Sequence, residues 1–411
     1  MENLRKNYED AGQGHLFTFW EELNEEEKKE LTHQLSSIDP NRVNQIFKQS
    51  TIKPEEEEDK VVLEPPPKES LESIIDVNQP EIKDKISKWE SIGFQSIKDQ
   101  KIAILLLAGG QGTRLRSSDP KGCYDIGLPS QKSLFQIQAE KIIRLQDLVG
   151  GIAIIPWYIM TSGPTRVLPA LTPEGKMFLE TQSRARGIEH IHAYCVDNCL
   201  VKVADPIFMG YCIDKQTLCG VKVVRKSQPT ESVGVIARKN KLWSVVEYSE
   251  MDESVASSID SQSGQLKFNS ANIANHFYSY KFLESIKSFE DKLSYHIANK
   301  KIPHIDLKTK ELIKPSKPNG IKLELFIFDV FPFVESLTLL EVDRKEEPVD
   351  VICWLNRNVG SNLRVVNSRN PDIELELSPI VSYAGEGLEI LNGKTIDKSA
   401  YVHDKDGLNK L

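Results

Sequence analysis

Residues Ile102 to Lys121 read IAILLLAGGQGTRLRSSDPK, and this stretch predicts the architecture of the chain around it. It opens with six consecutive apolar residues, Ile102 to Leu107. A short apolar run without alternation is typical of a strand that is buried on both faces, as in a parallel sheet covered by helices. We therefore expect an α/β fold with this strand inside a mainly parallel sheet.

The segment after the strand is rich in glycine and carries two cations. Gly109, Gly110 and Gly112 follow the strand, and Arg114 and Lys121 lie in the same loop. Glycines let the backbone approach a ligand closely, and their N–H groups can surround phosphate oxygens. Arginine adds a planar fork of donors and lysine a compact charge. The pattern indicates a loop that binds a polyphosphate.

Two common nucleotide-binding motifs do not fit this loop. A Walker A loop ends in Gly-Lys followed by Ser or Thr, whereas Lys121 is followed by Gly122. A dinucleotide-binding fingerprint needs a third glycine three residues after the second, and Leu115 occupies that position. The remaining pattern, G-G-x-G-T-R followed by Pro-Lys, is typical of sugar nucleotidyltransferases.

A longer string, LAGGQGTRL…SSDPKGCYDIGLPSQKSLFQIQAE, resembles the eukaryotic UDP-N-acetylglucosamine pyrophosphorylases, of the UDPGP type 1 family, as do VVEYSEM and ANIANHF downstream. The resemblance implies a Rossmann-like, GT-A-like nucleotidyltransferase core with a mixed, mainly parallel sheet. It implies that UTP and N-acetylglucosamine 1-phosphate react to give UDP-N-acetylglucosamine and pyrophosphate, with Mg²⁺ or Mn²⁺. The sugar phosphate attacks the α-phosphorus in line, so positioning and charge stabilisation dominate catalysis.

The resemblance also implies roles for individual positions. Arg114 and Lys121 match the catalytic pair that steadies the triphosphate and the developing pyrophosphate charge. Asp197 matches the aspartate near the nucleotide phosphates and the metal, and a carboxylate suits Mg²⁺. The nucleotide-binding segment is matched by Leu107, Ala108, Gly109, Gly110 and Gly112. The positions around the sugar and its phosphate are matched by Glu247, Tyr248, Asn272 and Lys322.

Several features depart from the family pattern. Family members carry a few dozen residues more at the join Arg166-Val167, and a second block with a P-D-G-N-G-G loop at the join Arg184-Ala185. Arg116 occupies a position that is normally glycine, and the S-P-L-K-N lysine of the tail is absent. Two alternatives to the active enzyme therefore stay open. One is a catalytically impaired splice variant or pseudoenzyme that retains only nucleotide binding. The other is a pyrophosphorylase for another sugar, forming UDP-N-acetylgalactosamine or UDP-glucose.

Composition narrows the class of partner. The formal net charge of −8 disfavours nucleic acid as the main partner. We see no secretory signal and no apolar stretch near the roughly 18 residues that a membrane span needs. The six cysteines are scattered without a C-x-x-C pair, as expected for reduced thiols in a cytoplasmic protein. The oligomeric state cannot be read from the sequence.

A length of 411 residues suggests two or three domains, at about 100–200 residues each. We expect a helical N-terminal region over 1–100, a catalytic core over 101–345 and a small β-rich C-terminal domain over 346–411. Leu16, Trp20 and Leu23 follow helical spacing near the N-terminus. Residues 221–248 alternate as short antiparallel strands, and Asp205 is the expected cap of a helix over 205–213.

Two smaller interpretations concern the core. Ser133 and Gln136 form an S-x-x-Q capping box, which predicts a helix that starts there. Its expected apolar face is formed by Phe135, Ala139, Ile142 and Ile143. His190 and His192 share one face of the expected strand over 190–196, and with no third ligand nearby we interpret them as packed side chains rather than a metal pair.

Overall fold

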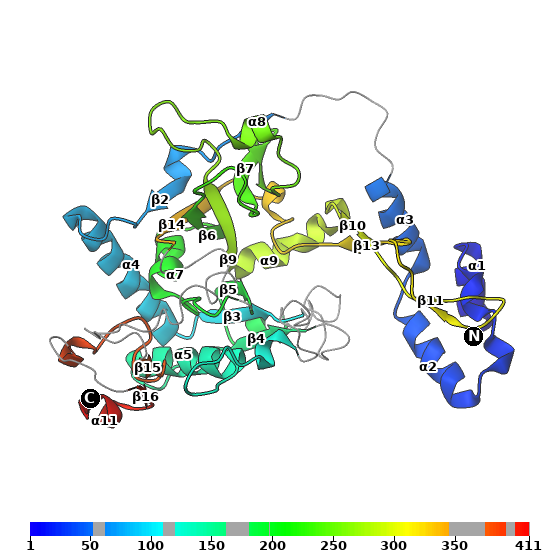
Figure 1. Cartoon of the computed structure of the whole chain (residues 1–411), viewed down its shortest axis with the longest axis horizontal. Helices are drawn as coiled ribbons and strands as arrows, with labels where there is room; N and C mark the ends of the chain where they lie inside the picture. The colour runs from blue at the N-terminus through cyan, green and yellow to red at the C-terminus, as the bar shows by residue number, and fades with distance from the viewer. Residues whose placement is uncertain are drawn as a thin grey trace. The chain divides into compact units, whose positions relative to one another are not determined.

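The computed structural model describes residues 1–51, 62–109, 120–161, 181–196, 198–344, 375–391 and 399–410. Contacts group the chain into two compact units, which are described separately: residues 1–61 with 290–329, and residues 62–289 with 330–411 (Figure 1). Residues 290–329 thus pack with the N-terminal helices. The division into functional domains at 100 and 345 stays a prediction.

The first unit combines helices with small antiparallel sheets. Its helices are α1 (Glu2–Asp10), α2 (Glu25–Ser36) and α3 (Pro40–Thr51). Its strands are β10 (His296–Lys300) paired with β13 (Gly320–Glu324), and β11 (His304–Ile305) paired with β12 (Leu312–Ile313). Arg42 pairs with Asp291 at 2.8 Å, and Lys310 with Glu22 at 2.6 Å. These ion pairs join chain segments that are distant in sequence.

The helix expected across Leu16, Trp20 and Leu23 is wrong. Two 3₁₀ turns, Gly14–Phe17 and Trp20–Glu22, occupy this stretch instead. The α-helix starts only after Asn24, whose side chain accepts the N–H of Glu27 while the Glu27 carboxylate accepts the N–H of Asn24. This reciprocal cap fixes the start of α2, because it satisfies the backbone N–H groups of Asn24 and Glu27, which have no partner within the helix.

The second unit is organised around one mixed sheet with the strand order β2-β14-β6-β9-β5-β3-β4. Its strands are β2 (Leu71–Ser73), β14 (Leu337–Val342), β6 (Cys219–Arg225), β9 (Ser270–Ser279), β5 (His190–Cys195), β3 (Ile102–Leu107) and β4 (Trp157–Met160). Every neighbouring pair in this order is parallel except the two pairs that β9 makes with β5 and β6. The expected mainly parallel α/β sheet is confirmed.

An antiparallel branch extends this sheet. β7 (Val235–Lys239) pairs antiparallel with β1 (Leu63–Glu64), β8 (Leu242–Val246) and β9. The antiparallel strands expected over 221–248 are confirmed for β7 and β8, whereas β6 belongs to the central sheet. The register of β9 against β6 shifts between Lys222 and Val223, where β9 carries two additional residues.

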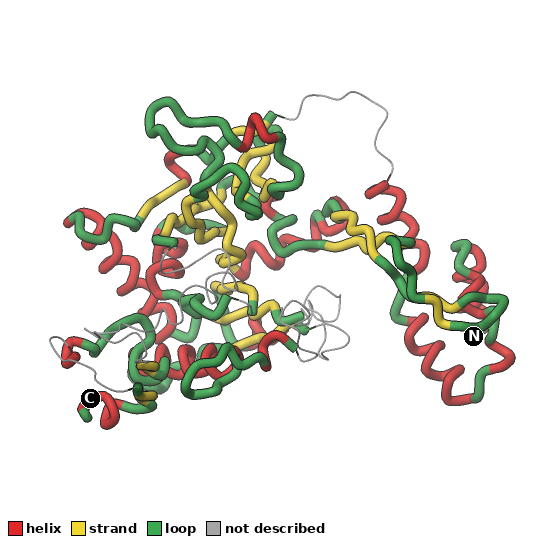
Figure 2. Tube along the Cα trace, viewed as in Figure 1, coloured by secondary structure: helices red, strands yellow, loops and turns green. Residues whose placement is uncertain are grey.

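Helices cover both faces of β3, as its unbroken apolar run predicts. Ile102, Ile104 and Leu106 belong to a core shared with α4 (Pro80–Lys98), α5 (Leu134–Leu148) and α7 (Pro206–Asp214). The alternate residues Ala103 and Leu105 pack against Ile191 and against Leu283 of α9 (Tyr280–Ser285). Figure 2 shows the strands of this unit running side by side with helices outside them.

Helices α4 and α7 touch through two glycines. A Cβ on Gly93 would lie 2.0 Å from the carbonyl oxygen of Pro206, and a Cβ on Gly210 would lie 1.8 Å from that of Trp89. Contact at backbone distance leaves no room for a side chain. Trp89 completes the contact edge-on to Tyr211, with ring centroids 4.8 Å apart. Helix α4 is therefore part of the core that surrounds β3.

The capping box of α5 is confirmed, but its expected apolar face is partly wrong. The side chain of Ser133 accepts the N–H of Gln136, and the side chain of Gln136 accepts the N–H of Ser133. Ile142 is buried, whereas Ile143 is 46% exposed. The polar side chains of Gln138 and Lys141 occupy the buried face instead, at 0% and 2% exposure.

The C-terminal part of the second unit is small. β15 (Leu375–Leu377) pairs parallel with β16 (Ala400–Val402), and α11 (Lys405–Asn409) follows. The other short elements of this unit are η3 (Lys68–Ser70), η5 (Lys121–Cys123), α8 (Glu253–Ala256), η7 (Ile286–Ser288), η9 (Phe331–Phe333) and η10 (Glu389–Leu391), whereas η8 (Glu290–Lys292) belongs to the first unit. Within the described ranges, no helix has the length and apolar character needed to span a membrane.

Candidate active site

The carboxyl ends of β3, β4 and β5 form one edge of the sheet. Leu107 lies opposite Met160 of β4 and Cys195 of β5. The N–H of Ala108 donates to the Met160 carbonyl at 2.7 Å, and the N–H of Val196 donates to the Leu107 carbonyl at 3.1 Å. Ligands of open α/β sheets bind at such carboxyl edges. The segment expected to bind the nucleotide therefore begins at this carboxyl edge, with Leu107, Ala108 and Gly109.

Some predicted site residues lie outside the described residues, namely Gly110, Gly112, Arg114 and Asp197, and so does Arg116. Their roles stay predictions. Gly109 precedes the first of these stretches, and Val196 and Asn198 flank Asp197. Since Val196 is bonded to Leu107, the chain reaches both the glycine segment and Asp197 from the same edge of the sheet.

Lys121 lies on a 3₁₀ turn that packs against the start of α5. Gly122 is buried there, and a Cβ on it would lie 2.2 Å from Cζ of Phe135. The N–H of Leu134 donates to the carbonyl of Tyr124 at 3.1 Å. The turn that presents Lys121 is thus fixed to the first turn of α5 through ring packing and a backbone hydrogen bond.

Sequence reasoning missed the buried polar face of α5. The Lys141 ammonium donates to the carbonyls of Cys199 and Val201 at 3.1 and 2.9 Å. Gln138, one turn earlier, accepts the hydroxyl of Tyr194 at 3.1 Å. The sequence contains a signal for this face. Gln138 and Lys141 lie three residues apart, the spacing of one helix face, and each is next to an apolar residue that the helix buries.

A buried histidine supports the loop that follows β5. The N–H of Ala204 donates to Nδ1 of His192 at 2.9 Å, so the other ring nitrogen carries the proton and donates to Oδ1 of Asn275. Burial lowers the pKa of His192 to about 4. The ring is fully buried and neutral, which agrees with a packed side chain. Within the described part of the chain, no group of three His, Cys, Asp or Glu residues could hold a metal ion.

A buried ion pair lies at the end of the same loop, where α7 begins. Nζ of Lys222 lies 2.6 Å from Oδ2 of Asp205, and the two residues are 0% and 4% exposed. Burial raises the pKa of Asp205, but the Lys222 charge and the N–H of Ile207 outweigh burial and lower it on balance. Oδ1 of Asp205 accepts that N–H at 3.1 Å, which confirms Asp205 as the cap of α7.

Two of the four predicted sugar positions meet at Gly234. The N–H of Asn272 donates to the Gly234 carbonyl at 2.9 Å, and a Cβ on Gly234 would lie 3.0 Å from Oε1 of Glu247. Tyr248, the next residue, is 53% exposed. Lys322 belongs to the first unit, on β13, where it pairs with Glu324 at 2.8 Å. The predicted roles of all four residues stay predictions.

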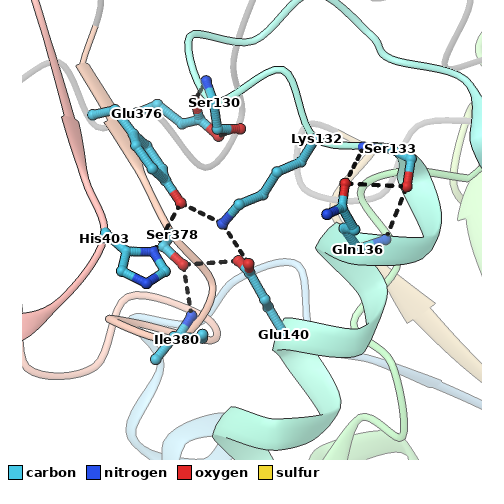
Figure 3. A network of polar contacts seen from close by, with 10 residues as sticks. Ser130, Lys132, Ser133, Gln136, Glu140, Glu376, Ser378, Ile380 and His403 are labelled. Atoms are coloured by element: carbon cyan, nitrogen blue, oxygen red, sulfur yellow. Dashed lines mark hydrogen bonds and ion pairs between the residues drawn. The ribbon is translucent and has the colours of Figure 1, made fainter.

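The C-terminal segment is bonded to the chain between Lys121 and α5. The backbone N–H and the hydroxyl of Ser130 both donate to Glu376, each at 2.7 Å. Lys132 donates to Glu140 and to Tyr401, and the hydroxyl of Ser378 donates to Glu140 at 2.8 Å. Figure 3 shows these groups converging between the loop, α5 and the C-terminal strands.

We expect acid to destabilise the folded chain through His192 and His276. Burial lowers their pKa values to about 4 and about 3, so both are neutral when folded and protonate only after unfolding. Their stabilisation is complete above pH 6.5 and is lost as the pH falls towards 4. At pH 5 the contribution of each histidine to the free energy of unfolding is lower by up to about 2 kcal/mol than at neutral pH. Urea unfolding at pH 7.5 and 5.0 measures the loss, and replacing the exposed His33 by Gln is expected to leave it unchanged. An equal free energy of unfolding at both pH values would contradict charge-neutral burial.

Comparisons with known proteins show the family of the chain. A family model described as UTP–glucose-1-phosphate uridylyltransferase matches residues 40–169 and 177–349. The chain belongs to this family. The UDP-N-acetylglucosamine pyrophosphorylase of Saccharomyces cerevisiae is 38% identical, and the match covers 98% of the chain and 100% of the yeast protein. The UDP-N-acetylhexosamine pyrophosphorylase-like protein 1 of Xenopus tropicalis is 37% identical over 98% and 94% of the two chains.

A solved structure shows the same family likeness. The uridine diphosphate N-acetylglucosamine pyrophosphorylase of Trypanosoma brucei, solved with an inhibitor, is 27% identical and superposes with a TM-score of 0.78, covering 98% of each chain. The resemblance expected from the glycine loop and the downstream strings is thereby confirmed. The nucleotidyltransferase fold is confirmed with it.

Relatives in the family carry residues that this chain lacks. The Xenopus comparison extends over 501 residues, and because 98% of 411 residues is about 403, roughly 98 positions are filled by the relative alone. The family model matches on both sides of residues 170–176, close to the join at Arg166. At the other join, the described chain closes a helical end: the N–H of Ile188 donates to Ser183 at 2.9 Å, and Gly187 adopts a positive φ of 66°.

Proposed function

We propose that this chain is a uridylyltransferase that forms UDP-N-acetylglucosamine and pyrophosphate from UTP and N-acetylglucosamine 1-phosphate. The observation that carries the proposal is the full-length match to relatives with this name, combined with Gly109 and the flanks of Asp197 at one carboxyl edge of the sheet. Cys123, Cys212 and Cys219 are free thiols, which fits the cytoplasmic location that we also propose.

In this proposal the main task of the described residues is to position the two substrates for reaction. The phosphate of the sugar is already ionised, so no general base is required, and the reaction depends on holding the two substrates in line. The turn fixed on α5 holds Lys121 ready to neutralise the leaving pyrophosphate. The Glu247 carboxylate lies next to Gly234, to which the backbone of Asn272 is bonded. In this proposal the Glu247 carboxylate and the Asn272 side-chain NH₂ bind the hydroxyl and acetamido groups of the sugar.

The proposal includes Mg²⁺ or Mn²⁺, with Asp197 as the residue that would hold it. The neighbouring Asn198 fits such a site, because its buried Oδ1 has no hydrogen-bond partner among the described residues. An oxygen acceptor of this kind suits a hard cation or one of its water ligands. When bound, the ion would neutralise charge on the triphosphate.

The decisive experiment is a pyrophosphate-release assay with UTP, Mg²⁺ and N-acetylglucosamine 1-phosphate. Turnover that requires all three components is expected, at a rate above that of the 1-phosphates of N-acetylgalactosamine and glucose. A higher rate with either of those sugars would assign another substrate. UTP binding without turnover would reject the proposal in favour of an impaired relative. The Lys83→Ala variant, altered on the exposed face of α4, serves as the matched active control.

A further inference from the structure

We propose that Lys141 is a positioning residue that holds the loop carrying Asp197 in the geometry that phosphoryl transfer requires. The proposal rests on the proposed function, because the role of Asp197 does. It extends that function to a helix residue outside the predicted phosphate and sugar positions.

Two bonds of Lys141 go to the backbone just beyond Asp197. Its ammonium donates to the carbonyls of Cys199 and Val201, two and four residues after Asp197, at 3.1 and 2.9 Å. Lys141 is 2% exposed, so these are charge-assisted bonds in a site nearly closed to water. Such bonds are roughly twice as strong as neutral ones. A buried lysine that binds main-chain carbonyls restrains the path of the backbone.

Other contacts hold the two ends of this loop, and Lys141 adds two bonds in its middle, where the N–H of Val201 also donates to the Asn198 carbonyl at 3.3 Å. At the start, the N–H of Asn198 donates to the Cys195 carbonyl at 3.2 Å, at the end of β5. Further along, Ala204 is bonded to the buried His192, and Asp205 is bonded to the buried Lys222. Among the described side-chain bonds to the backbone of residues 198–205, those from Lys141 lie nearest in sequence to Asp197. Their loss would weaken the hold on residues 199–201, which precede the bond from the Tyr383 hydroxyl to the Val203 carbonyl at 3.0 Å.

Helix α5 also supports the other side of the phosphate site. Its first turn carries Phe135, against which the Lys121 turn packs at Gly122. Lys141 lies six residues further along the same helix. One rigid element therefore sets the distance between the Lys121 turn and the Asp197 loop. Because a displacement of about 1 Å can reduce an enzymatic rate about 100-fold, this spacing matters for catalysis.

The test compares Lys141→Met with Arg144→Met in the full-length chain. Methionine keeps the length of the lysine side chain but removes its donors and its charge. Arg144 lies one turn along α5 and binds Glu386 of the C-terminal segment at 2.9 Å, so its variant controls for general weakening of the helix. Lys141→Arg retains charge and donors and is the rescue variant.

For Lys141→Met we expect kcat to fall about 10- to 100-fold. The Mg²⁺ concentration for half-maximal rate is expected to rise about tenfold, as when a contact that orients a metal ligand is lost, while KM for the sugar phosphate changes little. In the ligand-free protein, hydrogen exchange over residues 198–203 is expected to accelerate in Lys141→Met and not in Arg144→Met. Lys141→Arg is expected to recover most of kcat.

If hydrogen exchange over residues 198–203 is unchanged in a folded Lys141→Met protein, Lys141 does not restrain the loop. If exchange is faster but kcat and the Mg²⁺ dependence are unchanged, the restraint has no role in catalysis. If the wild-type chain shows no turnover, the proposed function fails, whereas the exchange measurement still decides whether Lys141 restrains the loop. If Lys141→Met does not fold, Lys141→Gln, which keeps one amide donor group, carries the same comparison.

Discussion

Lys121→Ala is expected to lower kcat about 100- to 1,000-fold while leaving the melting temperature close to that of the wild type. The loss corresponds to roughly 3–4 kcal/mol of transition-state stabilisation, the range found when a fixed donor to developing negative charge is removed. The turn itself should survive, because it is held by backbone bonds from Cys123 to Pro120 at 2.9 Å and from Tyr124 to Lys121 at 3.1 Å. Gly122 keeps its packing against Phe135.

Pyrophosphate release measures this effect in the forward direction, and UTP formation from UDP-N-acetylglucosamine and pyrophosphate measures it in reverse. Both directions share one transition state and the equilibrium constant is unchanged, so kcat/KM should fall by the same factor in the two directions. Lys121→Arg, which keeps the charge but changes its shape, is expected to retain an intermediate rate. Activity of Lys121→Ala within twofold of the wild type would remove Lys121 from the catalytic machinery.

The parts of the fold predicted correctly are those set by local sequence. The six apolar residues of β3 required cover on both faces, and Ser133 with Gln136 could satisfy each other's backbone at the start of α5. The misassigned parts depend on distant partners. Residues 14–22 have helical spacing, but the reciprocal cap between Asn24 and Glu27 delays the helix. Residues 290–329 join the N-terminal helices through ion pairs that spacing cannot reveal.

In the candidate site, too, the features set by local sequence could be predicted and those that depend on distant partners could not. The carboxyl edge that carries Gly109 could be predicted, because parallel strands bring their ends together. The approach of Glu247 and Asn272 to Gly234 could be inferred only from family resemblance, because it joins three segments that are separate in sequence. Lys141 was missed because the buried face of α5 was assigned from its apolar residues alone. The spacing of Gln138 and Lys141 indicates a polar face, but not that Lys141 binds the backbone of Cys199 and Val201.

Lys222→Met is expected to lower the free energy of unfolding by about 3–5 kcal/mol, the usual cost of removing one partner from a buried ion pair. The variant leaves the Asp205 carboxylate, 4% exposed, without the ammonium that lies 2.6 Å away in the wild type. Methionine fills the volume and tolerates the neighbouring ring of Phe208, so the loss comes from the unpaired charge and not from a cavity. Urea unfolding at pH 7.5 measures it.

The double variant Lys222→Met with Asp205→Asn separates charge from packing. Asparagine has no charge to desolvate, and its side-chain oxygen can still accept the N–H of Ile207 that caps α7. Most of the lost stability should therefore return, to within about 1–2 kcal/mol of the wild type. Lys101→Met, which breaks an exposed pair with Glu189, should cost less than about 1 kcal/mol and calibrates the scale. If the double variant were instead as unstable as the sum of its single variants, Lys222 would stabilise the core by packing, because two groups coupled through charge cannot be lost additively.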